Sequence, residues 1–385
     1  MKKQSNAPQI RFQNFEDEWV KQSLGKTVEI IMGQSPDSKN YTDNPNDYIL
    51  VQGNADMQNG RVVPRVWTTQ ITKLAEKGDL ILSVRAPVGD IGKTDYNVVL
   101  GRGVAAIKGN EFLFQLLTKM KQSHYWSKFS TGSTFESINS NDIKSAEIYL
   151  PSIEEQSAIG SLFRTLDDLL TSYKNNLANY QSLKATMLSK MFPKAGQTIP
   201  EIRLDGFEGK WENKILSEVT NITMGQSPKS ENYTDNPNDY ILVQGNADIK
   251  DKQVVPRLWT TEVTKMAEIG DIILTVRAPV GDIGKTDFNV VIGRGVAAIK
   301  GNDFIFFTLE KMKMTGFWNR FSTGSTFESI SSNDIKEAIV QLPTLDEQQA
   351  IGAYFSNLDN LIASHQEKIT QLETLKKKLL QDMFI

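Results

Sequence analysis

Apolar and polar positions follow a short pattern over much of this chain. Brief β-rich runs such as DYILVQG, DLILSV and VVLGRGVAAI lie between clusters of Gly, Pro, Asn and Asp. Runs of this length between turn-forming residues predict strands. An amphipathic pattern at Glu111–Lys128, repeated at Asp303–Arg320, predicts one helix within each set of strands. The pattern therefore predicts globular parts that mix α and β structure and are dominated by strands and loops.

A longer periodicity follows each strand-rich part. Mostly apolar residues recur at every seventh position in two rows: Ile159, Leu166, Tyr173, Tyr180, Met187 and Ile351, Leu358, His365, Leu372, Leu379. A second seam is expected at Leu162, Leu169, Leu183 and at Tyr354, Leu361, Leu375, although Asn176, Lys190, Lys368 and Asp382 interrupt it. Five heptads predict two long helices that pair as an intramolecular coiled coil. The alternative is two long helices that pack on a domain. Each helix would have roughly 36–40 residues and a length of about 55–60 Å.

Both long helices have a predicted start signal. The segments Pro151-Ser-Ile-Glu-Glu155 and Pro343-Thr-Leu-Asp-Glu347 place a hydroxyl residue three positions before a glutamate. This spacing predicts a capping box, in which the hydroxyl accepts from the glutamate N–H and the glutamate side chain reaches back.

The whole pattern occurs twice along the chain, as an internal repeat. NYTDNPNDYILVQGNAD at Asn40–Asp56 recurs at Asn232–Asp248, and RAPVGDIGKTD at Arg85–Asp95 recurs at Arg277–Asp287. The offset stays at 192 residues, as between Gly33 and Gly225, so no insertion disturbs the register. A period this long exceeds the roughly 20–50 residues of a solenoid repeat. It indicates a tandem duplication of a domain together with the helix that follows it.

The predicted fold class is therefore α+β, with two tandem α/β domains separated by two long helices. We assign residues 1–150 to the first domain and 151–192 to the central helix. Residues 193–342 form a linker and the second domain, and residues 343–385 form the last helix.

Composition narrows the class of protein. The 385 residues carry a formal charge of −3 and no cysteine, which excludes disulfides, thiolate metal sites and cysteine nucleophiles. No apolar run is long enough to span a membrane, and the start of the chain lacks an apolar signal segment, so we expect a cytoplasmic protein.

Candidate catalytic motifs are weak. GDIGKT at Gly89–Thr94 and Gly281–Thr286 ends like a phosphate-binding loop, but Pro87 and Pro279 stand where that loop needs its first glycine. The two histidines, His124 and His365, have no histidine at the equivalent position of the other copy. We therefore expect a binding protein with no catalytic or metal site of its own.

Both the order of domains and helices and their sequence motifs resemble one protein family. LPSIEEQSAIGSLFRTLDDLL at Leu150–Leu170 and LPTLDEQQAIGAYFSNLDNLI at Leu342–Ile362 resemble the helix entry of type I restriction–modification specificity subunits. The endings LKATMLSKMF and LKKKLLQDMF and the GDLILSVRAPVG and GDIILTVRAPVG segments fit as well. The resemblance implies two target recognition domains that each read half of a bipartite DNA site, in phage defence.

The same resemblance implies partners. The two long helices would form an antiparallel coiled coil that sets the spacing of the half-sites and docks two methyltransferase subunits. Restriction or translocase subunits would join through those. S-adenosylmethionine, ATP and Mg²⁺ would bind those partners, and no cofactor would bind this chain. A structural coiled-coil dimerisation protein and an ATPase that uses GDIGKT are the alternatives.

DNA recognition from loops needs side chains that pair with base edges. Three loops in each copy qualify, although each could be a structural turn. The candidates of the first copy are Gln34, Ser35, Asn40, Tyr41, Gln52, Asn54, Ser130, Thr131, Ser133 and Thr134. Those of the second copy are Gln226, Ser227, Asn232, Tyr233, Gln244, Asn246, Ser322, Thr323, Ser325 and Thr326.

Arginines at predicted strand ends complete the candidate set: Arg85, Arg102, Arg277 and Arg294. Each could reach phosphate or guanine, or instead hold a structural carboxylate such as Asp90 or Asp282. Because the candidate loops match between the copies, we predict that both domains read the same half-site in inverted orientation. The target would then be a near-palindromic, interrupted sequence.

Overall fold

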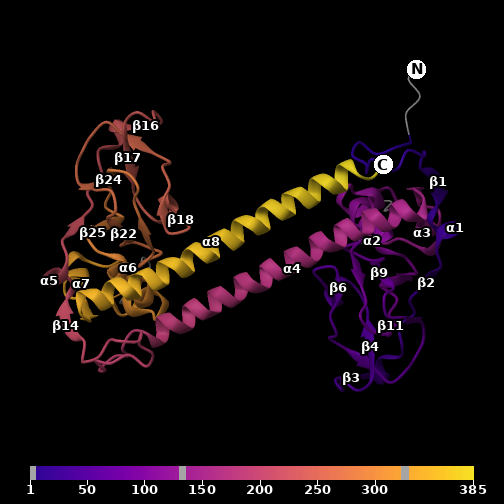
Figure 1. Cartoon of the computed structure of the whole chain (residues 1–385), viewed down its shortest axis with the longest axis horizontal. Coiled ribbons are helices and arrows are strands. Elements are labelled where there is room, and N and C mark those ends of the chain that lie inside the picture. Colours follow the sequence, from indigo (N-terminus) through magenta and orange to yellow (C-terminus); the bar gives the residue numbers. More distant parts are fainter. Residues whose placement is uncertain (1–5, 130–135, 322–328) are drawn as a thin grey trace. The chain divides into compact units, whose positions relative to one another are not determined.

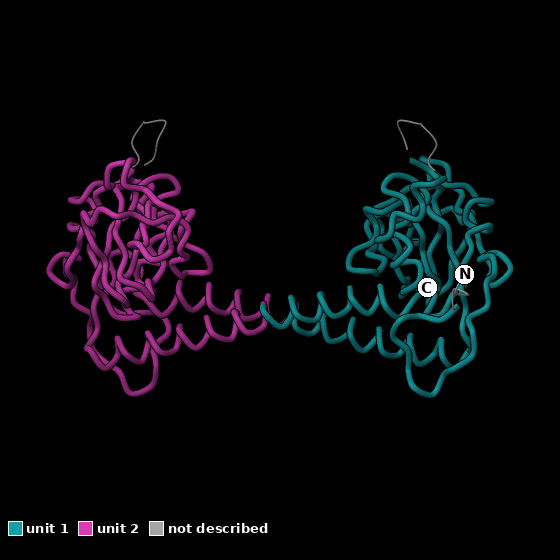
Figure 2. The backbone as a smooth tube through the Cα atoms, turned by 90° about the horizontal axis from the view of Figure 1, so that it is seen from above, with its two compact units in different colours: residues 1–174, 367–385 teal, residues 175–366 magenta. Residues whose placement is uncertain are grey.

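Figure 1 shows a computed structural model of the chain, which describes residues 6–129, 136–321 and 329–385. The chain divides into two compact units (Figure 2). Unit 1 comprises Met1–Lys174 and Glu367–Ile385, and unit 2 comprises Asn175–Gln366. Each unit therefore combines one strand-rich part with sections of both long helices.

The described residues of unit 1 form three sheets. The strands β1 (Val20–Ser23) and β13 (Glu147–Leu150) form an antiparallel pair. A six-stranded sheet has the order β2-β12-β9-β10-β6-β5. Its strands are Ile30–Met32, Val104–Ile107, Leu80–Ser83, Ile91–Lys93, Arg61–Val62 and Met57–Gln58. A five-stranded sheet has the order β3-β7-β4-β11-β8. Its strands are Tyr41–Thr42, Trp67–Thr68, Tyr48–Val51, Val98–Leu100 and Leu74–Ala75.

Unit 2 repeats this arrangement strand for strand. The pair is β14 (Glu212–Ile215) with β26 (Ile339–Leu342). The six-stranded order is β15-β25-β22-β23-β19-β18, at Ile222–Met224, Val296–Ile299, Ile272–Thr275, Ile283–Lys285, Gln253–Val254 and Ile249–Lys250. The five-stranded order is β16-β20-β17-β24-β21, at Tyr233–Thr234, Trp259–Thr260, Tyr240–Val243, Val290–Ile292 and Met266–Ala267.

The short helices lie around these sheets. They are α1 (Leu24–Thr27), α2 (Glu111–Gln122) and α3 (Ser140–Lys144) in unit 1, and α5 (Leu216–Val219), α6 (Asp303–Met314) and α7 (Ser332–Lys336) in unit 2. The predicted helices at 111–128 and 303–320 end early. His124 and Gly316 have φ of 55° and 67°, and a left-handed residue at this place stops a helix. Short 3₁₀ helices, η3 (Tyr125–Phe129) and η6 (Phe317–Phe321), follow.

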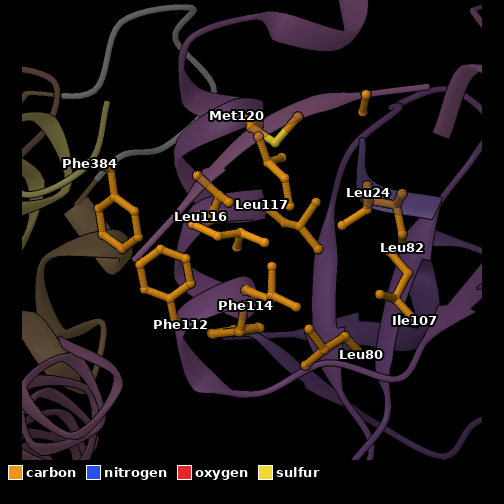
Figure 3. Close-up of a cluster of buried hydrophobic side chains, with 14 of the residues drawn as sticks. Leu24, Leu80, Leu82, Ile107, Phe112, Phe114, Leu116, Leu117, Met120 and Phe384 are labelled. Carbon is orange, nitrogen blue, oxygen red and sulfur yellow. The ribbon is translucent and has the colours of Figure 1, made fainter. Parts of the chain in front are cut away.

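The six-stranded sheet of unit 1 is buried on both faces. Successive side chains of a strand point to opposite faces, and β9 shows the result. Leu80 and Leu82 pack in a core with α2 and the long helices, whereas Ile81 packs in a second core with Val51 and Val98 of the five-stranded sheet. Figure 3 shows Leu80, Leu82 and Ile107 of the sheet on the side of the cluster that Leu117 of α2 faces. The sheet is therefore the middle of three layers.

The two long helices have the predicted length. α4 runs from Ile153 to Lys190 and α8 from Leu345 to Asp382, 38 residues each. In unit 1, Phe163 packs on Phe384 at 5.7 Å between ring centroids, and Lys174 pairs with Glu373 at 2.6 Å. The residue number in α8 falls as that in α4 rises, so the helices are antiparallel there. In unit 2, Lys184 pairs with Asp359 at 2.6 Å and Tyr180 packs on His365 at 5.1 Å. Neither helix, nor any other in the described ranges, combines the length and apolar character of a membrane span.

The first predicted seam is confirmed, but the second is wrong by one residue. Ile159 and Leu166 of the first seam are buried. Leu169, Leu183, Leu361 and Leu375 of the predicted second seam are 37–44% exposed. The buried row lies at the next positions: Phe163, Leu170 and Lys184 in α4 and Phe355 and Ile369 in α8, followed by Met191 and Met383 one residue beyond the helix ends. Each buried residue of the second row therefore lies four residues after a residue of the first row, whereas the prediction placed it three residues after.

A buried lysine explains why the sequence pointed to the wrong row. Lys184 occupies the true seam with only 6% of its side chain exposed, which an apolar pattern would exclude. Its ammonium is neutralised within unit 2 by Glu310 at 2.8 Å and Asp359 at 2.6 Å. Burial of a charge is tolerated when it is paired and hydrogen-bonded in this way.

The start of α4 fits half of the predicted capping box. Ser152 Oγ accepts from the N–H of Glu155 at 3.3 Å. The carboxylate of Glu155 does not reach back, because Arg11 donates to both of its oxygens at 2.7 Å. Gln156 bridges the carbonyl of Pro151 and the side chain of Asn110. Arg203, Glu347 and Gln348 repeat these contacts in unit 2.

An aromatic residue two positions beyond the end of a long helix completes each unit. In unit 1, Phe384 packs on Trp19. It also packs on Phe112, which lies beside it in Figure 3. In unit 2, Phe192 packs on Trp211 and Phe304. The core of unit 1 thus contains the C-terminal residues of α8, and the core of unit 2 contains the last residues of α4.

Candidate nucleic-acid interface

Candidate residues from four distant segments meet at one end of the sheets in unit 1. β2 and β9 both pair with β12, so the residues that follow β2 and β9 lie beside those that precede β12. The N–H of Gly33 donates to Val104 at 3.0 Å, and the N–H of Val84 donates to Gly103 at 2.9 Å. Continuing the register of β9 and β12 sets Arg85 opposite Arg102. This brings the segments of Gln34, Arg85 and Arg102 together.

The fourth segment joins through the five-stranded sheet. β4 and β11 are parallel neighbours, and the N–H of Gly101 donates to Val51 at 2.7 Å. Gln52 therefore follows β4 directly beside the Gly101–Gly103 turn. We call Gln34, Ser35, Gln52, Arg85 and Arg102 the polar edge of unit 1. Gln226, Ser227, Gln244, Arg277 and Arg294 form the polar edge of unit 2.

Glycines allow these segments to approach one another. A Cβ on Gly33 would lie 2.0 Å from the carbonyl oxygen of Gly101, and one on Gly103 would lie 2.0 Å from that of Gln52. Both gaps are far below van der Waals contact, so only glycine fits. The run predicted as one strand region at 98–107 is split by this turn into β11 and β12, which belong to different sheets.

Some candidate side chains hold the loops in place. Ser35 Oγ accepts from the backbone N–H of Arg102 at 3.1 Å. The amide of Asn40 donates to Gln70 at 2.8 Å, and Tyr41 is half-buried in β3. These contacts give Ser35 and Asn40 internal partners, whatever they bind in addition.

Gln52 is held in place through its backbone, and its side chain is half-buried. Asp56, 6% exposed, accepts from the N–H of Gln52 at 2.7 Å and of Gly53 at 3.2 Å. Arg65 lies 3.6 Å from the same carboxylate and donates to the carbonyl of Ala55. Asn54 is half-buried at the start of the 3₁₀ turn Asn54–Asp56. The carboxylate thus fixes the loop in front of Gln52.

The arginines of the polar edge are exposed. Asp90, the carboxylate considered as a partner for Arg85, is paired with Lys121, and its equivalent Asp282 is paired with Lys313. Among the described residues, no ion pair involves the guanidinium of Arg85 or Arg102. These groups therefore remain available for an anion or a base edge.

The third candidate loop lies outside the described residues. It contains Ser130, Thr131, Ser133 and Thr134, and Ser322, Thr323, Ser325 and Thr326 in the second copy. The described residue Ser137 forms a β-bridge with Arg85, and the N–H of Ala86 donates to Glu136 at 3.0 Å.

The turn at residues 69–73 was missed by the sequence analysis. Thr72 donates its hydroxyl to the carbonyl of Gln34, and the N–H of Leu100 donates to Lys73 at 2.8 Å. The N–H of Thr69 donates to the carbonyl of Asn40. The near-identity of WTTQITK and WTTEVTK in the two copies was the signal that could have revealed this turn.

Unit 2 builds the same edge with the same contacts. Gly225 donates to Val296 at 3.0 Å, and Gly293 donates to Val243 at 2.8 Å. Ser227 accepts from Arg294 at 3.1 Å, and Asp248 accepts from Gln244 at 2.8 Å. Asn232 donates to Glu262 at 2.7 Å, and Asn246 is exposed. Tyr233 lies in β16, and Arg277 bridges Ser329.

The remaining residues that could have suggested catalysis or base stacking are paired or packed within the fold. Lys93 of GDIGKT lies in β10, where it pairs with Glu111 and lies 5.2 Å from the ring centroid of Phe114. Trp126 and Trp318 are buried in the cores. His124 occupies the left-handed position that ends the α2 segment, and His365 packs on Tyr180.

Comparison with known proteins identifies the same domain in both halves of the chain. The model of the type I restriction modification DNA specificity domain matches residues 16–205 and again residues 208–374. The putative type I restriction enzyme MjaX specificity subunit of Methanocaldococcus jannaschii is 29% identical over 281 residues, which cover 70% of this chain and 66% of that protein. The MjaVIII specificity subunit of the same organism is 22% identical over 291 residues, which cover 70% and 68%.

A solved structure has the same fold. The S subunit of a type I restriction-modification system from M. genitalium superposes with a TM-score of 0.68 at 17% identity, over 98% of this chain and 99% of that chain. The predicted fold class, two tandem α/β domains with long helices between and after them, is confirmed.

Proposed function

Because the chain belongs to the family of type I restriction modification DNA specificity domains, we propose that it is a DNA sequence-recognition subunit. Each unit reads one half of a bipartite DNA site. The observation that carries this proposal is the polar edge, which is built twice from the same residues and the same internal contacts. Two equal reading surfaces suit a target with two equal halves.

The chemistry of the polar edge suits base recognition. Arginine forks pair with guanine, and glutamine amides pair with adenine. Gln34, Arg85 and Arg102 are exposed, and Gln52 is half-buried behind its glycine. Their backbones are fixed by β-pairing and by Asp56, and side chains on a fixed backbone lose less conformational entropy on binding.

The two units read closely related half-sites, in inverted orientation. Gln34, Ser35, Gln52, Arg85 and Arg102 all have identical equivalents. The target is then a near-palindromic, interrupted sequence.

Catalysis belongs to partner subunits. Two methyltransferase subunits dock on the long helices, and restriction or translocase subunits join through them in the cytoplasm. S-adenosylmethionine, ATP and Mg²⁺ enter with these partners. The pairing of Lys93 with Glu111 argues against a phosphate-binding loop in this chain, because its ammonium is already neutralised.

The proposal is tested by sequencing the methylated bases of cells that carry this chain and a methyltransferase partner. The expected motif has two related, inverted half-sites separated by unread base pairs. Unrelated half-sites would show that the two polar edges do not read DNA alike. ATP hydrolysis by the purified chain, lost in Lys93→Ala and Lys285→Ala, would instead favour the ATPase.

A further inference from the structure

One side chain beside the polar edge differs in chemistry between the two units. The turn that holds Gln34 carries Gln70 in unit 1, and the equivalent turn carries Glu262 in unit 2. The neighbouring residues, Ile71 and Val263, are both apolar, and the flanking threonines are identical. At the equivalent positions 70 and 262, written 70/262 below, unit 1 therefore has an amide and unit 2 a carboxylate, within turns that are otherwise alike.

In unit 1, the oxygen of Gln70 is used internally. Gln70 Oε1 accepts from the backbone N–H of Asp37 and from the amide of Asn40, both at 2.8 Å. A backbone N–H can only donate, so the group that faces it must be the oxygen. The amide nitrogen of Gln70 then points away from these partners. The exposed side chain thus offers a hydrogen-bond donor.

In unit 2, the same two internal contacts leave an acceptor. Glu262 Oε2 accepts from the N–H of Lys229 at 2.8 Å and from the amide of Asn232 at 2.7 Å. Within the described ranges, no hydrogen bond reaches the second oxygen, Oε1. The Lys229 N–H and then the Asn232 amide lower the pKa of Glu262, so it is ionised at neutral pH. A carboxylate in this state can only accept.

This position lies at the polar edge itself. The N–H of Thr69 donates to the carbonyl of Asn40, and Thr72 donates to the carbonyl of Gln34. Thr261 and Thr264 make the same contacts in unit 2. Residue 70/262 is therefore held between the two parts of the first candidate loop.

We propose that residue 70/262 determines specificity at one base pair of each half-site, and that the half-sites differ there. The amide of Gln70 donates to an acceptor such as guanine O6 or N7 or thymine O4. The free oxygen of Glu262 accepts from the amino group of cytosine or adenine. A guanine edge, which offers two acceptors and no donor, satisfies Gln70 but not Glu262, and a cytosine edge, which offers only a donor, does the reverse. This inference rests on the proposed function, because it requires that the polar edges read DNA.

A purely local role for Glu262 would give a different result. Lys229 replaces Asp37 in the second copy, so Glu262 could serve only to balance the charge of Lys229. In that case the change at position 262 would alter the stability of the loop and leave the base preference unchanged. Lys229 and Glu231 supply the matched control, because both differ from Asp37 and Lys39 and lie in the same loop.

The experiment determines the methylated motif for four chains expressed with a methyltransferase partner. These are the unchanged chain, Glu262→Gln, Gln70→Glu, and the double variant Lys229→Asp with Glu231→Lys. In the unchanged chain, we expect two inverted half-sites that differ at one base pair. Glu262→Gln should convert the second half-site to the first, and Gln70→Glu should do the reverse. The preference at that base pair should shift by about tenfold, the order of one base contact. The double variant should leave the motif unchanged.

Other outcomes separate this inference from the proposed function. Half-sites that are identical in the unchanged chain would overturn the inference and leave the proposed function standing. A difference that survives both Glu262→Gln and Gln70→Glu would do the same. Loss of methylation by both variants, with the melting temperature preserved, would show that the position only supports the loop. Half-sites that are unrelated at most positions would overturn the shared reading by the polar edges, and this inference with it.

Discussion

Within each polar edge, hydrogen bonds separate residues that hold loops from residues that remain open. Ser35 holds the backbone of Arg102, Asn40 holds Gln70, and Asp56 holds Gln52. The guanidinium of Arg102 and the side chain of Gln34 lie exposed on this fixed frame. A substitution of a residue that holds a loop should change the stability of that loop. A substitution of an exposed residue should change which DNA sequence is bound.

Arg102→Lys tests whether an exposed residue of the polar edge determines the DNA sequence that is bound. Lysine keeps the positive charge but lacks the planar fork that pairs with guanine. We expect the preference at one base pair of one half-site to fall by about tenfold, measured by competition between duplexes that differ at that pair. Arg294→Lys is the matched variant and should affect the other half-site. Equal weakening for all duplexes would mean that Arg102 contacts phosphate only.

Sequence reasoning reached these residues because they stand between glycines and strand ends. It placed Arg85, Arg102 and the two amide loops in the candidate set, but it could not show that four segments meet. That meeting depends on the pairing of β12 with both β2 and β9, which is a contact over long sequence distances. It also missed Gln70. The repeat of WTTQITK as WTTEVTK marks the turn, but a single polar residue after a short strand does not show that the turn contacts Gln34 and Asn40.

At the scale of the elements, the long helices show where a periodic pattern is ambiguous. Leu162 and Phe163 are neighbours, as are Leu169 and Leu170, so apolar residues mark both possible second rows. Packing in unit 1 selects Phe163 and Leu170, and Leu169 stays 43% exposed. The long helices themselves were predictable, because their heptads and start signals are strong. The facing row was not, because it contains the paired lysine at position 184.

Leu170→Ala tests the facing row. Leu170 is 8% exposed, so its truncation should lower the free energy of unfolding by about 2–4 kcal/mol in urea titrations. Leu169→Ala is the control on the adjacent residue and should change it by less than about 1 kcal/mol. The reverse order of the two effects would restore the row that the sequence indicated.

At the scale of the whole chain, each long helix contributes to both units. The boundary between the units falls at Lys174 in α4 and at Gln366 in α8, within continuous helices. The duplication was plain from the sequence, since the offset never changes. The allocation of Phe384 to unit 1 and Phe192 to unit 2 was not, because only the folded chain brings Phe384 to Trp19.

Continuous helices shared by two reading units can act as a ruler on DNA. Inserting four residues after Ala178 and after Thr370 lengthens each helix by about 6 Å at 1.5 Å per residue. Duplex DNA rises about 3.4 Å per base pair, so the unread gap should grow by roughly one to two base pairs. Both half-sites should stay unchanged. The measurement is the methylated motif of cells that carry the lengthened chain with a methyltransferase partner.

The size of the insertion decides whether the helices still pair. Four residues are close to one helical turn, so the buried row nearly realigns and the coiled coil continues through a stutter. Two residues turn the row by about 200° and should abolish methylation, which makes the two-residue insertion the matched control. An unchanged gap with intact methylation in the four-residue variant would mean that the helices dock partners without measuring DNA. A longer gap would mean that helix length, set by residues that touch no base, determines which sequences are recognised.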